Sequence, residues 1–196
     1  MHGTTLSFEN IHQHGELFAN ILRVRREAVD RRNTWALPGS LGQAYDQYDT
    51  PASRWLAVHD GNGEVLAGVR MTPTSAKCGV YSYMLRDAQN DLLEGIPADL
   101  LNDDAPVDPD VWEVTRGFVS RKVPARQRHA VREQLVAQML RTAQDEGVKR
   151  LLSLMPTNWN RWARRCHLVI SPAGPARNLA GTSYQAVWVD FDARLH

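Results

Sequence analysis

The chain has 196 residues, a formal net charge of +1, and 43% hydrophobic and 23% charged residues. This size and composition fit one domain, residues 1–196, with a substantial buried core, and they exclude wholesale disorder. A charge balance near zero argues against a nucleic-acid-binding protein. The two cysteines form no CxxC pair, and no Cys/His cluster has metal-ligand spacing. Because the sequence has neither a signal peptide nor a long apolar run, we expect a cytoplasmic protein without a membrane span or a metal.

The first half of the chain predicts a helix followed by a β-hairpin. Apolar residues recur at helical spacing between about residues 14 and 32, which indicates an amphipathic helix. The segment 33–51 holds several prolines and glycines and is expected to be irregular. Two strands follow at 54–58 and 65–71, joined by the turn Asp60-Gly61-Asn62-Gly63.

The second half alternates strands and helices. We expect, in chain order, a strand at 111–120, a helix at 126–146, a strand at 149–155, a short helix at 158–165, and strands at 168–170 and 183–191. Because hairpins and crossover helices occur together, the pattern predicts one three-layer α/β/α domain around a mixed central sheet.

Charged residues interrupt the predicted strand at 111–120. Strand alternation puts Trp112, Val114 and Arg116 on one face and Glu113 and Thr115 on the other. A glutamate and an arginine in an otherwise apolar strand must each find a partner or line a cavity. Both a structural ion pair and a catalytic site fit this segment, and the segment alone favours the ion pair.

A second group of polar residues lies around the irregular segment. Asp46 and Asp49 are three residues apart in a loop, and paired carboxylates can bind a cation, a metal or a substrate amine. Aspartates of a solvated turn give the same pattern, and the pair taken alone favours that interpretation. Arg25 and Trp35 flank the start of this segment, and Arg70 lies near the end of the second hairpin strand.

The order and spacing of these residues resemble the LuxI-type acyl-homoserine-lactone synthase family. The matching pieces are Arg25, Trp35, Asp46-Gln47-Tyr48-Asp49, Gly68-Val69-Arg70 and Trp112-Glu113-Val114-Thr115-Arg116, so the resemblance covers about Arg25 to Val119. No single piece is specific, but their order and spacing together are. Two positions depart from the family pattern, because Val29 and Gln89 stand where the family usually has phenylalanine.

The resemblance implies a GNAT-like fold with a mixed, mostly antiparallel sheet. It also implies an acyltransferase that makes the N-acyl-homoserine lactone signals of bacterial quorum sensing. Its substrates would be S-adenosylmethionine and an acyl thioester of acyl-carrier protein or coenzyme A. The reaction would release methylthioadenosine and need no cofactor.

The same resemblance implies roles for individual residues. The expected catalytic set is Glu113, Arg116, Asp46 and Asp49. The expected substrate-binding set is Arg25, Trp35, Arg70, Leu152 and Met155. Within the catalytic set, Glu113 is expected to take the proton of the substrate amine, directly or through one water. The acyl chain is expected to run along the strand at 149–155 and to be unsubstituted or branched.

Two other functions stay open at this point. The loss of both phenylalanines favours a GNAT-like N-acyltransferase with a different amine acceptor, and the retained charged residues oppose it. A non-catalytic binding module would tolerate the loss of Glu113. A run of basic residues between Arg121 and Arg132 is either a solvated face or a docking surface for the acyl donor.

Overall fold

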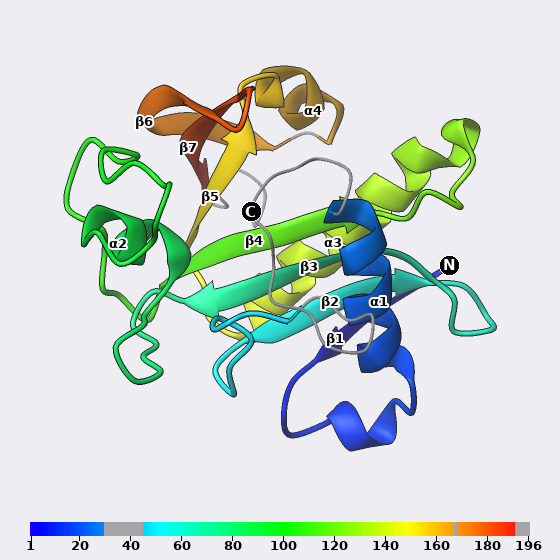
Figure 1. Ribbon diagram of the computed structural model, residues 1–196. Coiled ribbons are helices and arrows are strands. Elements are labelled where there is room, and N and C mark those ends of the chain that lie inside the picture. The colour runs from blue at the N-terminus through cyan, green and yellow to red at the C-terminus, as the bar shows by residue number, and fades with distance from the viewer. Residues whose placement is uncertain (30–44, 167, 191–196) are drawn as a thin grey trace. The chain divides into compact units, whose positions relative to one another are not determined.

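Figure 1 presents the protein as a computed structural model that describes residues 1–29, 45–166 and 168–190. Within these residues, seven strands form one sheet in the order β1-β2-β3-β4-β5-β7-β6. The strands are β1 (His2–Leu6), β2 (Arg54–His59), β3 (Val65–Pro73), β4 (Val111–Val119), β5 (Arg150–Pro156), β6 (Val169–Leu179) and β7 (Thr182–Asp190). The α-helices are α1 (Leu17–Val29), α2 (Met84–Gln89), α3 (Arg128–Asp145) and α4 (Trp159–Arg165).

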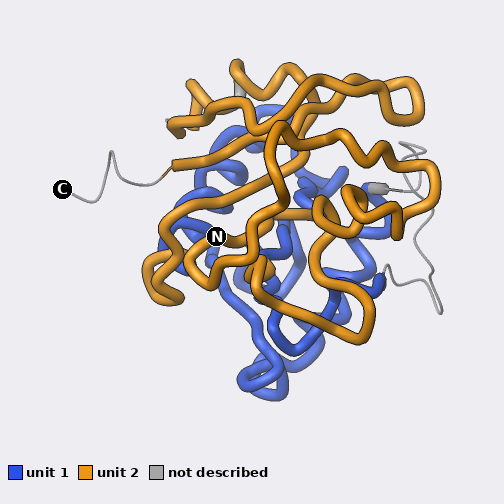
Figure 2. Tube along the Cα trace, turned by 90° about the vertical axis from the view of Figure 1, so that its left-hand side faces the viewer, with its two compact units in different colours: residues 1–71, 116–142 blue, residues 72–115, 143–196 orange. Residues whose placement is uncertain are grey.

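The directions of the strands make the sheet mixed. The pairs β1–β2, β2–β3, β5–β7 and β6–β7 are antiparallel, and the pair β4–β5 is parallel. The sheet is therefore mixed and mostly antiparallel, as the resemblance implied. The chain divides into two compact units, coloured separately in Figure 2. Unit 1 is Met1–Met71 with Arg116–Thr142, and unit 2 is Thr72–Thr115 with Ala143–His196. The single domain expected from the sequence stays a prediction.

Unit 1 has helices on both faces of its strands. Successive side chains of a strand point to opposite faces, and β2 uses both. Trp55 and Ala57 pack with Ile21 of α1 in one apolar cluster. Val58 packs with Val131 of α3 in another. The layer order helix, sheet, helix predicted from the sequence is therefore present in this unit.

Unit 2 is built on β5, which runs parallel to β4 on one side and antiparallel to β7 on the other. The β4–β5 register runs from Val111 opposite Arg150 to Val114 opposite Ser153. At the last pair, the Ser153 hydroxyl donates to the Val114 carbonyl oxygen over 2.9 Å. Helix α4 packs on these strands, where Trp159 forms an apolar cluster with Ala163 and Val187.

Most predicted elements agree with the structure, and three differ. The strand β1 and the helix α2 were not predicted from the sequence, and β6 is much longer than the three residues expected at 168–170. No helix in the described parts of the chain combines the length and the apolar character of a membrane-spanning helix.

Candidate active site

Asp49 lies at the centre of a buried charge cluster in unit 1, which comprises Arg25, Asp46, Asp49, Arg70 and Arg116. The Asp49 carboxylate accepts hydrogen bonds from both terminal nitrogens of Arg25, at 3.1 and 2.5 Å, and from Nη1 of Arg70 at 3.0 Å. It also accepts Nε1 of Trp55 at 2.8 Å and the backbone N–H of Asp46 at 2.9 Å. Because a buried charge is tolerated when it is paired and hydrogen-bonded, this arrangement explains how Asp49 can be buried.

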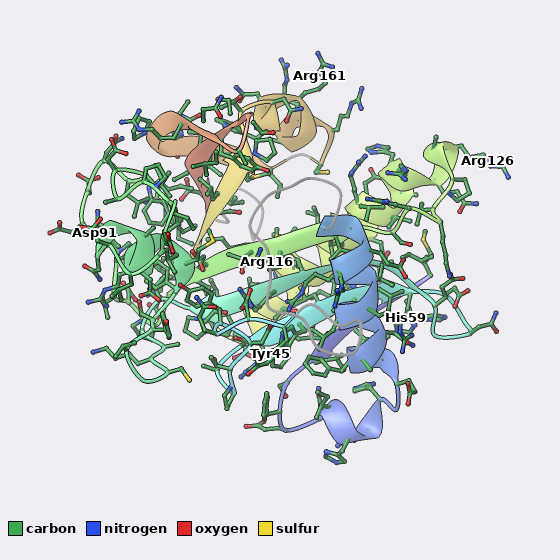
Figure 3. The ribbon with its side chains drawn as sticks, viewed as in Figure 1. Tyr45, His59, Asp91, Arg116, Arg126 and Arg161 are labelled. Atoms are coloured by element: carbon green, nitrogen blue, oxygen red, sulfur yellow. The ribbon has the colours of Figure 1, made fainter. Side chains whose placement is uncertain are left out.

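Asp46 joins the two arginines that come from the sheet. Its Oδ1 accepts Nη1 of Arg70 at 2.5 Å, and its Oδ2 accepts Nε of Arg116 at 2.9 Å. The backbone N–H of Tyr48 donates to Oδ1 at 2.9 Å, and the Tyr48 ring lies under the Arg70 guanidinium. The side chain of Arg116 is 14% exposed, against 1% for Arg70 and Asp46, so Arg116 is the member of this trio that reaches solvent. Figure 3 labels Arg116 on its strand.

The arginines keep both aspartates ionised. Burial alone would raise the pKa of Asp46, but the positive charges of Arg70 and Arg116 outweigh it and hold that pKa below its usual value. Burial also opposes ionisation of Asp49, and the hydrogen bonds from Arg25 with the charge of Arg70 lower its pKa strongly. The pKa of Arg116 is lowered by burial first, while Asp46 partly offsets the effect.

The backbone of β4 is irregular at Arg116. This residue has φ +58°, a left-handed conformation that is uncommon for a residue other than glycine. The regular alternation predicted across 112–116 therefore ends at Arg116. Residues in such conformations store strain and cluster at functional sites.

Glu113 lies in unit 2, on the part of β4 that pairs with β5. It is 1% exposed, and its carboxylate accepts two backbone N–H groups, Met84 at 3.1 Å and Leu85 at 2.9 Å. These are the first two residues of α2, whose N–H groups have no acceptor inside the helix. The N-cap residue Tyr83 makes no side-chain cap. Glu113, which lies on a strand distant in sequence, therefore caps the N-terminus of α2 in place of a local side chain.

Two polar side chains of the α2 region hold the loop that precedes β4. The Tyr83 hydroxyl donates to the Pro106 carbonyl oxygen at 2.7 Å, and burial raises the pKa of this phenol, so it stays a donor. Gln89 donates from Nε2 to the Asp103 carbonyl oxygen at 3.0 Å and accepts the Ala105 N–H at 2.7 Å. Gln89, which stands where the family usually has phenylalanine, thus binds the backbone of this loop.

The predicted acyl-binding residues lie on different faces of β5. Leu152 is fully buried and is the register partner of Glu113. Met155 is three residues further on, so its side chain points to the opposite face, where it packs with Trp159 and Val187. The structure thus places Leu152, but not Met155, on the face of Glu113. Trp35 lies outside the described residues, and so does the side chain of Val29.

Two residues around these groups were not predicted from the sequence. Trp55 was taken only as part of an apolar strand, although its indole N–H binds Asp49. Asp87 was not singled out, although it is 1% exposed and accepts hydrogen bonds from Ser82. No sequence signal set Asp87 apart, because polar and apolar residues are mixed around it. In the described parts of the chain, no three His, Cys, Asp or Glu side chains gather as metal ligands.

Comparison with known proteins relates this arrangement to one family. The family model for autoinducer synthases matches residues 9–193. An acyl-homoserine-lactone synthase of Ralstonia nicotianae is 32% identical over 165 residues, which is 81% of this chain and 74% of that protein.

Solved structures extend the likeness to the fold. A CoA-dependent acyl-homoserine lactone synthase, crystallised with S-adenosylmethionine and isopentyl-CoA, is 24% identical with a TM-score of 0.74, covering 95% of this chain and 81% of that one. An acyl-CoA N-acyltransferase from Pseudomonas aeruginosa is 12% identical with a TM-score of 0.59, covering 96% and 99% of the two chains. The fold is therefore GNAT-like. Together with the family match over residues 9–193, these findings show that the chain belongs to the autoinducer synthase family of acyl-homoserine-lactone synthases.

Proposed function

We propose that the chain transfers an acyl group from an acyl thioester to the α-amine of S-adenosylmethionine and then closes the homoserine lactone ring. The observation that carries this proposal is the match to autoinducer synthases across residues 9–193. The buried charge cluster supports it, because Arg25, Asp46, Asp49, Arg70 and Arg116 all lie within that span and form one hydrogen-bonded network. As the sequence predicted, we expect the reaction in the cytoplasm.

The charge cluster orients the group that binds the substrate carboxylate. Asp46 and Asp49 accept hydrogen bonds from the arginines and fix their positions. Arg116 then meets the substrate, because its side chain reaches solvent while Arg25 and Arg70 are almost fully buried. A guanidinium suits this task, since its planar fork binds both oxygens of a carboxylate. Arg25 and Arg70 support this site from behind.

Glu113 is the proposed base. Each of its oxygens accepts one backbone N–H, from Met84 and from Leu85, and these bonds hold the carboxylate in one orientation. A carboxylate held in this way is suited to take the proton of the substrate amine, directly or through one water. The left-handed backbone at Arg116 supports a second role for β4, in which a peptide N–H after Arg116 stabilises the oxyanion of the tetrahedral intermediate.

The proposed reaction has two balanced steps. The deprotonated α-amine attacks the thioester carbonyl carbon, a C–N bond forms, the C–S bond breaks, and the thiol leaves with a proton. The carboxylate oxygen of the acylated product then attacks its own γ-carbon. The C–S bond of the sulfonium breaks, and neutral methylthioadenosine leaves with the electron pair.

The acyl donor is proposed to be a thioester of coenzyme A or of acyl-carrier protein, with an unsubstituted or branched acyl group. Leu152 supports an apolar path beside Glu113, because it is fully buried and is the register partner of that residue. Met155 lies on the other face of β5 and limits the space there through its contact with Trp159. A related synthase was crystallised with isopentyl-CoA, so a branched five-carbon thioester belongs in the test panel.

Release of free thiol tests the proposal and its rivals. Wild-type protein is mixed with straight-chain and branched acyl-CoA and acyl-carrier thioesters, with S-adenosylmethionine or another amine as acceptor. Thiol release that depends on S-adenosylmethionine supports the proposal. Release that follows another amine points to a different N-acyltransferase, and a folded protein that releases no thiol with any pair is not the proposed enzyme. Glu113→Gln should lose turnover by roughly 100-fold or more, measured on variant protein that circular dichroism shows to be folded.

A further inference from the structure

The chain that leads into α2 is fixed by a buried carboxylate that has no part in the proposed reaction. Asp87 is 1% exposed. Its two oxygens accept the backbone N–H of Ser82 at 3.1 and 3.0 Å, and Oδ1 also accepts the Ser82 hydroxyl at 2.6 Å. Burying a carboxylate is costly unless it is well hydrogen-bonded. An aspartate at this position therefore has a specific task in holding Ser82.

Three further hydrogen bonds continue from Ser82 to the proposed base. The next residue, Tyr83, is anchored through its hydroxyl to the Pro106 carbonyl oxygen. The two residues after it, Met84 and Leu85, donate their backbone N–H groups to Glu113. Asp87 itself donates its backbone N–H to the Tyr83 carbonyl oxygen at 2.9 Å, which closes the first turn of α2.

We propose that Asp87 is a positioning residue for Glu113. By holding Ser82, it fixes the peptide groups of Met84 and Leu85, and the hydrogen bonds from these two groups hold the Glu113 carboxylate in one orientation. This inference rests on the proposed function, because it assigns Asp87 to the same carboxylate that is proposed to take the proton.

The test compares Asp87→Asn with Asp91→Asn. Asparagine has nearly the same shape as aspartate but leaves one oxygen to accept from Ser82 and loses the charge. Asp91 undergoes the same chemical change just beyond the other end of α2, where its side chain is exposed (Figure 3). Asparagine also tolerates the left-handed φ of +57° at that position. We expect Asp87→Asn to lower kcat about 10- to 100-fold with little change in KM for S-adenosylmethionine. Asp91→Asn should behave as wild type.

A double-mutant cycle separates positioning from a general effect on folding. If Asp87 acts through Glu113, Asp87→Asn should slow the wild-type enzyme but cause no further loss in the Glu113→Gln background. Equal losses in both backgrounds, or a folded Asp87→Asn variant with wild-type kcat, would overturn the proposal.

Hydrogen exchange of the Met84 and Leu85 amides gives a readout that does not need turnover. Exchange should be faster in Asp87→Asn than in Asp91→Asn, and unchanged protection would contradict the role assigned to Asp87. If Asp87→Asn does not fold, Ser82→Ala decides the question. It keeps the backbone donor and removes only the hydroxyl bond, so a loss of a few fold in kcat supports the proposal and a wild-type kcat overturns it. A wild-type protein that makes no product at all refutes the proposed function instead.

Discussion

Replacing Asp49 with asparagine should be among the most destabilising single substitutions in the chain. The carboxylate accepts five hydrogen bonds, from Arg25, Arg70, Trp55 and the backbone of Asp46, and its side chain is 1% exposed. Asparagine keeps the shape of aspartate, but it turns one acceptor oxygen into a donor that faces other donors. It also leaves two almost fully buried arginines short of one negative charge.

The expected cost follows from the burial of these partners. Breaking a buried ion pair by neutralising one partner costs about 3–5 kcal/mol. A typical domain has a free energy of unfolding of about 5–15 kcal/mol, so Asp49→Asn should remove a large part of the stability. Urea denaturation followed by tryptophan fluorescence measures this loss, and Trp55 reports on the same cluster.

The matched control is Asp99→Asn. Asp99 also binds an arginine through two hydrogen bonds, 3.0 and 2.6 Å to Arg177, but that pair is exposed. Exposed ion pairs contribute little because water screens them, so the stability of Asp99→Asn should stay close to that of wild type. An Asp49→Asn variant as stable as wild type would refute the reasoning. Equal losses in the two variants would show that burial does not set the cost.

Three further predictions concern the same unit. Because Arg25 and Arg70 lower the pKa of Asp49 against the effect of burial, the unfolded chain takes up a proton at about pH 4 while the folded chain does not. The stability that this carboxylate contributes should therefore be present at neutral pH and be lost progressively as the pH falls below about 4. Urea titrations should then show the free energies of unfolding of wild type and Asp49→Asn approaching each other as the pH falls, and a difference that stays constant with pH would contradict this. Gly68→Ala should lower the free energy of unfolding by about 1–3 kcal/mol, because an added Cβ would lie 2.8 Å from the Phe118 ring. The control Gly61→Ala meets open space and should lower it less. Equal melting temperatures of the two variants would show that the contact at Gly68 is not tight. At Arg116, which has φ +58°, glycine should give a protein more stable than alanine by roughly 1 kcal/mol, and the reverse order in thermal denaturation would rule out the left-handed backbone.

Elements held by local patterns were accessible from the sequence. The apolar spacing in α1 and α3 predicts helices, and the turn at 60–63 predicts the β2–β3 hairpin, because these signals lie within one element or between neighbours. The strand β1 was missed because its pairing with β2 joins residues that are 49 to 57 positions apart in the sequence. Helix α2 was missed because Glu113 binds the N–H groups that a local cap would otherwise satisfy.

The residues of the candidate site were accessible as a set, but their contacts were not. Arg25, the two aspartates, Arg70 and Arg116 were singled out by spacing and resemblance, and the structure brings them together. Which arginine binds which aspartate depends on how a helix, an irregular segment and two strands pack, and no local pattern records that. Strand alternation already implies that the side chains of Leu152 and Met155 point to opposite faces of β5. Both were nevertheless expected to line the same acyl-binding path.

The most direct test of the proposed reaction is mass spectrometry of its two organic products. S-adenosylmethionine labelled in the carbons of its methionine chain is incubated with the purified protein and the thioester that releases most thiol. The proposed mechanism predicts a labelled acyl-homoserine lactone, which names the acyl group, and methylthioadenosine in equal amount, with both reduced together in Glu113→Gln. Thiol release with neither the labelled lactone nor methylthioadenosine would contradict it, because the acyl group would then have gone to a different acceptor.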